Sequence, residues 1–225
     1  MDFLESLEKD SRFMLQLAGH RYIPPIQPRH MKLEVKDALK EALTRRGIGR
    51  FWSHQVEAID LIRQGEHVVV MTPTASGKSL IYNIPVIESL MDNPDTKALY
   101  LFPLKGLEQD QVKNLNELFN SVHIGPPKQK RSSRSHLESA EVYDGDTTSY
   151  RRKQIRESVP SVVFTNPDML HLAINPFHAK WELFFKGLKY VVLDEVHTYR
   201  GVFGSHMAHV VRRLRRICHH WGANP

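Results

Sequence analysis

The segment from residue 67 to residue 91 constrains the fold of this chain more than any other part of the sequence. A short β-branched run, His67–Met71, is followed by residues 72–79, which read Thr-Pro-Thr-Ala-Ser-Gly-Lys-Ser, and by a helical pattern from Lys78 to Met91. A strand, a Gly/Ser/Thr turn and a helix in this order are typical of the phosphate loop G-x-x-x-x-G-K-[ST], here with Thr72 in place of the first glycine. The segment therefore predicts an α/β domain that binds a nucleotide.

Each residue type in this loop has a physical task toward a phosphate. Backbone N–H groups from Thr74 to Lys78 can form a nest around the β-phosphate, and Gly77 permits its close approach. The Lys78 ammonium can reach the β- and γ-phosphates, and the Ser79 hydroxyl can ligate Mg²⁺. The dipole of the following helix adds positive potential at its N-terminus. The predicted nucleotide contacts in the loop are Thr74, Ala75, Ser76, Gly77, Lys78 and Ser79.

The rest of the chain alternates between strand-like and helical patterns. Apolar runs at Ala98–Phe102, Ser161–Thr165 and Tyr190–Leu193 predict buried strands, and residues 54–63, 107–119, 150–157 and 205–221 have helical patterns. Nearly continuous apolar strands separated by helices favour a doubly wound, mostly parallel sheet. Residues 1–50 are expected to form a helical N-terminal extension, with an amphipathic helix over residues 33–46, and residues 51–225 to form the α/β domain.

Two acids at the end of the last apolar run are the expected partners of the phosphate loop. Residues 191–197 read Val-Val-Leu-Asp-Glu-Val-His. Asp194 can hold Mg²⁺ through water, and Glu195 can position and deprotonate an attacking water. An acid pair at a strand end is common, so it is specific only together with the loop upstream.

Bulk properties exclude several classes of protein. The chain has 225 residues, 41% of them hydrophobic, and one cysteine, which cannot form an intrachain disulfide. Neither a signal peptide nor a membrane span is recognisable, so we expect an intracellular, cytoplasmic protein with no membrane partner. The net charge of +6 suits a polyanionic partner. Residues 124–140 have no hydrophobic period and several basic residues; they form either a solvated insertion or a basic arm that touches phosphates.

The order of motifs resembles that of the DEAD/DEAH-box helicases of superfamily 2. Asp194-Glu195-Val196-His197 is similar to their D-E-x-H box, and residues 51–55, Phe-Trp-Ser-His-Gln, are similar to the upstream motif that reads adenine. The resemblance implies an RecA-like P-loop NTPase domain and assigns adenine recognition to Gln55. Trp52, which stands where an RecQ-type motif has arginine, either stacks on the base or packs. His197 is implied to link the ATP site to later motifs.

Three further segments resemble the family's motifs that grip the nucleic-acid backbone. They are residues 103–111, 143–147 and 165–170, and the implied strand contacts are Pro103, Lys105, Gly106, Gly145, Asp146, Thr165 and Asn166. Residues of this kind offer N–H and O–H groups to phosphates without reading bases, so we expect little sequence preference. Arg212, Arg213, Arg215 and Arg216 share a helical segment with an apolar face. They are expected at a solvated rim, or at a contact to another domain.

The run from Asp194 to Arg216 resembles one branch more closely, the YprA-like and MrfA-like helicases and their fungal relatives. This resemblance implies an ATP-dependent, Mg²⁺-dependent enzyme that translocates 3′-to-5′ on single-stranded DNA, rather than RNA, in DNA repair. The family needs a second RecA-like domain with arginine fingers, so the chain is expected to be the first motor domain of a longer, monomeric protein and nearly inactive alone. The alternatives are a nucleotide-gated binding module without helicase activity and an RNA helicase. The Gln55 motif argues against another kind of P-loop ATPase.

Overall fold

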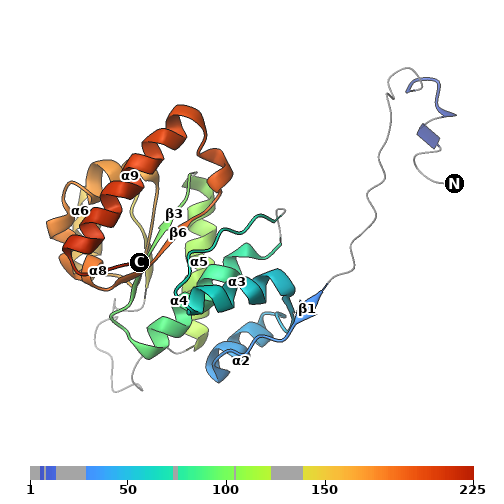
Figure 1. Ribbon diagram of the computed structural model, residues 1–225, viewed down its shortest axis with the longest axis horizontal. Coiled ribbons are helices and arrows are strands. Elements are labelled where there is room, and N and C mark those ends of the chain that lie inside the picture. Colours follow the sequence, from blue (N-terminus) through green and yellow to red (C-terminus); the bar gives the residue numbers. More distant parts are fainter. Residues whose placement is uncertain (1–5, 8, 14–28, 73–75, 104, 123–138) are drawn as a thin grey trace.

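Four parallel strands form the centre of the fold (Figure 1). The computed structural model describes residues 6–7, 9–13, 29–72, 76–103, 105–122 and 139–225, without the side chains of residues 105–108. Within these residues the order in the sheet is β4 (Ala140–Val142), β5 (Val162–Thr165), β3 (Lys97–Leu101) and β6 (Leu188–Leu193). Leu99 of β3 lies between Val163 and Val191. All four carboxyl ends therefore meet at one edge of the sheet.

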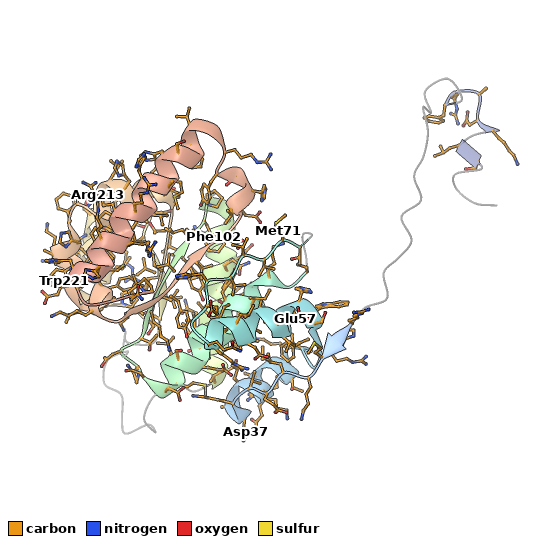
Figure 2. The ribbon with its side chains drawn as sticks, viewed as in Figure 1. Asp37, Glu57, Met71, Phe102, Arg213 and Trp221 are labelled. Carbon is orange, nitrogen blue, oxygen red and sulfur yellow. The ribbon has the colours of Figure 1, made fainter. Side chains whose placement is uncertain are left out.

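Helices cover both faces of the sheet because successive strand residues point to opposite sides. Ala98, Tyr100 and Phe102 share one core with the helices α2 (Asp37–Arg45), α3 (Ser53–Arg63), α4 (Lys78–Asp92) and α5 (Lys105–Val122). Figure 2 labels Phe102 in this interior. Leu99 and Leu101 share a second core with residues of the elements on the other face. The predicted doubly wound α/β sheet is confirmed.

The second face is built from one long helix and several short ones. The long helix α9 (Gly201–His220) buries Met207, Val210, Leu214 and Ile217 and leaves its four arginines exposed, as the sequence predicts. Figure 2 labels Arg213 on this helix. The short elements are α6 (Ser149–Ser158), α7 (Pro167–Met169), η2 (Leu170–Ile174), η3 (His178–Trp181), α8 (Glu182–Lys186) and η4 (Val196–Thr198). No sequence pattern indicates the elements between residues 167 and 186.

The segment before residue 53 packs onto the domain. A two-residue strand β1 (His30–Met31) pairs antiparallel with β2 (Phe51–Trp52), and the rings of His30 and Trp52 stack 4.5 Å apart. The predicted amphipathic helix over residues 33–46 is α2, and its apolar face lies in the same core as the sheet. The Trp52 ring thus packs against His30, and its stacking on a base stays a prediction.

Two predictions about strands are wrong. Residues 67–71 form no strand, and Val69 and Met71 are 82% and 92% exposed; Figure 2 labels Met71 at the periphery. A strand needs a partner for its backbone N–H and C=O groups, and no described strand pairs with this segment. Conversely, Ala140–Val142 forms β4, although residue 140 was assigned to the insertion. Residues 124–138 of that insertion lie outside the described residues.

Candidate nucleotide-binding and nucleic-acid site

The phosphate loop ends in a left-handed glycine that opens α4. Gly77 is the N-cap, with φ 73° and ψ 29°, and Ser79 lies in the first helical turn. The Lys78 ammonium donates a hydrogen bond to the Thr72 carbonyl at 2.9 Å, and the hydroxyls of Thr72 and Ser76 lie 2.6 Å apart. These contacts fold the loop around Lys78. Thr74 and Ala75, two predicted nucleotide contacts, lie outside the described residues.

Helix α3 holds this loop through one buried amide. The Gln55 side-chain oxygen accepts from the Trp52 N–H at 2.9 Å, and its nitrogen donates to the carbonyls of Gly77 at 3.0 Å and Ser76 at 3.3 Å. Gln55 is only 2% exposed. Its observed partners are therefore backbone groups of the loop and of its own N-terminus. Recognition of adenine by Gln55 stays a prediction.

The acid pair lies at the carboxyl end of β6. The Asp194 N–H donates to the Leu101 carbonyl at 3.0 Å, which extends the pairing with β3. Its carboxylate accepts from the Glu195 N–H at 2.8 Å and from the Tyr82 hydroxyl at 3.2 Å. Tyr82 follows Lys78 by one turn of α4, so side chains at these positions share a helical face. One side chain thus connects the helix of the phosphate loop to Asp194.

Glu195 has an unusual backbone for a side-chain-bearing residue. Its φ of 50° lies in the left-handed region, which costs a residue other than glycine on the order of 1–3 kcal/mol. The N–H and hydroxyl of Thr198 both donate to the Glu195 carbonyl, at 2.9 and 2.8 Å. The side chain lies 3.2 Å from Nδ1 of His197. The turn therefore holds Glu195 and His197 together at the strand end.

Two tyrosines that the sequence analysis missed surround Asp194. Burial, and then the charge of Asp194, raise the pKa of Tyr82, and the same two causes raise the pKa of Tyr199 to about 12. The Tyr199 hydroxyl is buried and has no hydrogen-bond partner among the described residues. Both groups stay neutral donors at physiological pH. The four-residue spacing from Lys78 could have signalled Tyr82; Tyr199 had no comparable signal.

The groups at this site suit a magnesium nucleotide. Mg²⁺ prefers oxygen ligands and usually keeps several waters while it binds one or two carboxylates and substrate phosphates. A hydroxyl at Ser79 and a carboxylate at Asp194 match that donor set. Within the described ranges no cluster of three or more His, Cys, Asp or Glu side chains could hold a metal ion. A nucleotide that brings its own phosphate ligands fits such a site.

The residues predicted to contact the nucleic-acid strand lie along the same edge of the sheet. Pro103 follows β3, Lys105 and Gly106 open α5, Gly145 and Asp146 follow β4, and Asn166 follows β5. Gly145 and Asp146 are exposed. The Asp144 carboxylate shapes their loop, because it accepts from the N–H groups of Asp146 and Thr147. With the strand order β4-β5-β3-β6, these loops form a row that ends beside Asp194.

The predicted contact of Thr165 with the nucleic-acid strand is wrong, because Thr165 is buried. Thr165 has no exposed surface, and its hydroxyl donates to the Tyr143 carbonyl at 2.6 Å. It connects β5 to the loop after β4 and cannot present its side chain to a strand. The neighbouring Asn166 caps α7 by accepting from the Met169 N–H at 2.9 Å and is half-buried.

Comparisons with known proteins show the family to which the chain belongs. The family model described as DEAD/DEAH box helicase matches residues 52–222. The chain is 45% identical over 205 residues to the uncharacterized ATP-dependent helicase YprA of Bacillus subtilis, covering 89% of this chain and 26% of the relative. It is 44% identical over 169 residues to the ATP-dependent helicase HRQ1 of Saccharomyces cerevisiae, covering 75% of this chain and 15% of the relative.

A solved structure of the DUF1998 helicase MrfA bound to DNA and AMPPNP is also similar. It superimposes with a TM-score of 0.82 at 44% identity, and the match covers 90% of this chain and 27% of that one. The chain thus spans about a quarter of the length of YprA and of MrfA. In the described part of the chain, no helix has the length and apolar character needed to cross a membrane.

Proposed function

Since the chain belongs to the DEAD/DEAH-box helicase family, we propose that it is the ATP-binding motor domain of a DNA helicase. The observation that carries the proposal is the connection of Lys78 and Asp194 through α4 and Tyr82. It brings the phosphate loop and the acid pair to one edge of the sheet. A nucleotide there meets a cation at one end and a carboxylate pair at the other.

Each group at the site has a task toward Mg-ATP. Bound Mg-ATP supplies the phosphoanhydride bond that hydrolysis breaks. Lys78, at the N-terminus of α4, neutralises charge on the β- and γ-phosphates, and Ser79 with Asp194 supplies oxygens for the metal. Glu195 orients a water and accepts its proton. His197, 3.2 Å from Glu195, connects this base to the rest of the motor.

The row of loops at the carboxyl edge suits a single strand of DNA. Gly145 is exposed and can offer its backbone N–H to a phosphate without reading bases. Two similar structures, those of MrfA and Lhr, are described as bound to DNA and to ssDNA. We therefore favour single-stranded DNA over RNA, and the resemblance favours 3′-to-5′ movement in DNA repair.

The longer relatives suggest what completes the motor. A second RecA-like domain would close over the γ-phosphate, with the complete protein acting as a monomer. The alternative, a nucleotide-gated binding module without hydrolysis, does not need a water-activating acid. The presence of Glu195 beside Asp194 therefore favours the enzyme.

Calorimetry with Mg-ADP tests the nucleotide site. Lys78→Ala removes a charge-assisted contact, typically worth about 1.5–3 kcal/mol, so binding should weaken at least about tenfold. The matched control is Lys40→Ala on α2, which removes an exposed lysine outside the site. Equal affinities of the Lys78→Ala chain and the unmodified chain would refute the assignment.

Fluorescence anisotropy with labelled oligonucleotides tests the strand face, the row of loops proposed to bind single-stranded DNA. Affinity should vary little with base sequence, and its logarithm should fall with the logarithm of salt concentration by about 0.7 per phosphate contacted. Tighter binding of RNA than of DNA would favour the RNA-helicase alternative. Binding without salt dependence would contradict a phosphate-contacting face.

A further inference from the structure

A basic pocket lies beside the row of strand-contacting loops, between α6 and the η2–η3 segment. Its cavity of about 250 Å³ is lined by Tyr143, Ser149, Arg152, Arg156, Phe177 and Lys180, together with Ala173. Ser149, Arg152 and Arg156 are spaced three and four residues apart and therefore share one face of α6. Lys180 reaches the pocket from η3. Segments separated by about 20 residues in the sequence thus bring three cations together.

These cations have no carboxylate partner among the described residues. Arg151 on the same helix pairs with Glu141, and Lys153 lies 3.7 Å from Glu157, but Arg152, Arg156 and Lys180 take part in no ion pair there. No acidic side chain lines the cavity. The result is a local excess of three positive charges in a concave surface, an arrangement that attracts an anion.

The arginines keep donor capacity after their internal contacts. A guanidinium has five N–H donors. The Arg156 guanidinium donates to the Tyr143 hydroxyl at 2.9 Å, the one side-chain hydrogen bond of Arg156 among the described residues. Arg152 uses Nη2 for two carbonyls, while its Nε is buried without a partner in the described part. Lys180 contacts the face of the Phe177 ring, 5.2 Å from its centroid.

Arg152 connects the pocket to the loop after β4. Its two acceptors are the carbonyls of Asp144 at 2.8 Å and Gly145 at 3.0 Å. Asp144 faces the loop rather than the cavity, since its carboxylate accepts from Thr147. A strand that crosses Gly145 therefore passes next to the pocket. Arg152 thus joins the pocket to the loop that the strand is proposed to contact.

We propose that this pocket binds a phosphodiester group of the same nucleic-acid strand, beyond the loop of Gly145 and Asp146. This inference rests on the proposed function, because it extends the strand face by one further contact. The volume lies below the roughly 300–1,000 Å³ of pockets that enclose a drug-sized ligand. A cavity of this volume suits a phosphate group with its sugar. Arg156 and Lys180 supply charge-assisted hydrogen bonds, and Ser149 supplies a hydroxyl at the N-terminus of α6.

Two lysine-to-glutamine substitutions, each of which removes one positive charge, test the proposal. Lys180→Gln removes a pocket ammonium that donates no hydrogen bond to the described residues. Lys153→Gln removes an exposed cation of α6 that does not line the cavity. In anisotropy titrations Lys180→Gln should bind a single strand about two- to fivefold more weakly. Its salt slope should fall by about 0.7. Lys153→Gln should match the unmodified chain.

Arg156→Gln is a second variant, with folding checked by its melting temperature because Arg156 also binds the Tyr143 hydroxyl. A folded Arg156→Gln chain should lose affinity and slope as Lys180→Gln does. If both pocket variants keep the affinity and slope of the unmodified chain, the proposal is overturned while the strand face stands. If the unmodified chain binds no strand, the proposed function itself fails.

Inorganic phosphate serves as a probe to distinguish two ligands of the pocket, the nucleic-acid strand and a free phosphorylated molecule. Each variant keeps the phosphate loop, so a difference in phosphate-induced thermal stabilisation between Lys180→Gln and Lys153→Gln reports on the pocket. A difference there together with the loss of strand affinity supports the proposal. A difference there with unchanged strand affinity assigns the pocket to a free phosphate compound and overturns it.

Discussion

The Tyr82 hydroxyl lies 3.2 Å from Oδ2 of Asp194, and this hydrogen bond joins α4 to the end of β6. A second pair joins the same two elements at their other ends, where the hydroxyls of Ser89 and Tyr190 lie 2.6 Å apart. The first connection orients a carboxylate of the nucleotide site, whereas the second lies away from it. Phenylalanine substitutions can therefore separate positioning from stability.

Tyr82→Phe should weaken Mg-ADP binding about tenfold, since groups that orient a metal ligand typically contribute 10–100-fold to metal affinity. The ring keeps its packing against Tyr100. With EDTA in place of Mg²⁺, the Tyr82→Phe chain and the unmodified chain should bind ADP with equal affinity. Tyr190→Phe, the matched control, should lose about 1 kcal/mol of stability and keep its Mg²⁺ dependence. Equal Mg²⁺ dependence in both variants would show that Tyr82 is only structural.

Gly77→Ala should abolish nucleotide binding by calorimetry. A Cβ at Gly77 would lie 2.4 Å from the Gln55 amide nitrogen, and φ of 73° disfavours any side chain. Gly47→Ala is the matched control, because its φ is 76° and no atom lies within 4 Å of its added Cβ. The left-handed backbone should cost each variant about 1–2 kcal/mol of stability, and the contact with Gln55 adds to this cost in Gly77→Ala. Normal Mg-ADP affinity in the Gly77→Ala chain would contradict the described loop.

The 225-residue chain alone should hydrolyse ATP slowly and unwind no duplex. An arginine finger contributes roughly 10³–10⁵ in rate, and the α9 arginines are exposed on a helix whose apolar face packs on the core. Phosphate release with saturating single-stranded DNA should be near background and barely change in Glu195→Gln. Robust DNA-stimulated turnover that Glu195→Gln abolishes would show that one domain suffices.

Lys97→Met should stabilise the domain at neutral pH. Lys97 is 4% exposed, its ammonium has no hydrogen-bond partner among the described residues, and burial lowers its pKa from the ordinary 10.5, partly opposed by Asp95. The unfolded chain therefore binds more protons between the lowered pKa and 10.5, so the stability of the unmodified chain rises with pH through that window. Below this pH window, the full cost of burying the charged Lys97 ammonium destabilises the unmodified chain.

The melting temperature of Lys97→Met should be higher by roughly 2–4 °C, the shift that about 1 kcal/mol produces in a domain of this size. The difference should shrink as pH approaches 10.5. Lys40→Met removes an exposed lysine of α2 and should show neither effect. A destabilised Lys97→Met chain would mean that the ammonium has a favourable role in the fold.

Local patterns in the sequence determined the parts of the fold that depend on neighbours along the chain. The helix after Gly77, the apolar strands β3, β5 and β6, and the buried face of α9 follow from periodicity and from residue types that suit one backbone conformation. The order of motifs also predicted that the acid pair Asp194-Glu195 is the partner of the phosphate loop with Lys78, since the two motifs act together on a magnesium nucleotide. These predictions needed no knowledge of distant contacts.

Tertiary structure decided the outcomes that depend on partners distant in sequence. The run at residues 67–71 is apolar enough for a strand, but a strand forms only where another backbone accepts its hydrogen bonds. Thr165 is a plausible phosphate contact by residue type, yet its hydroxyl is buried against Tyr143. Gln55 donates to Gly77, 22 residues away, and Lys180 meets Arg156 across a cavity. Periodicity reports which side of a helix or strand is apolar, whereas these contacts depend on how the elements pack in three dimensions.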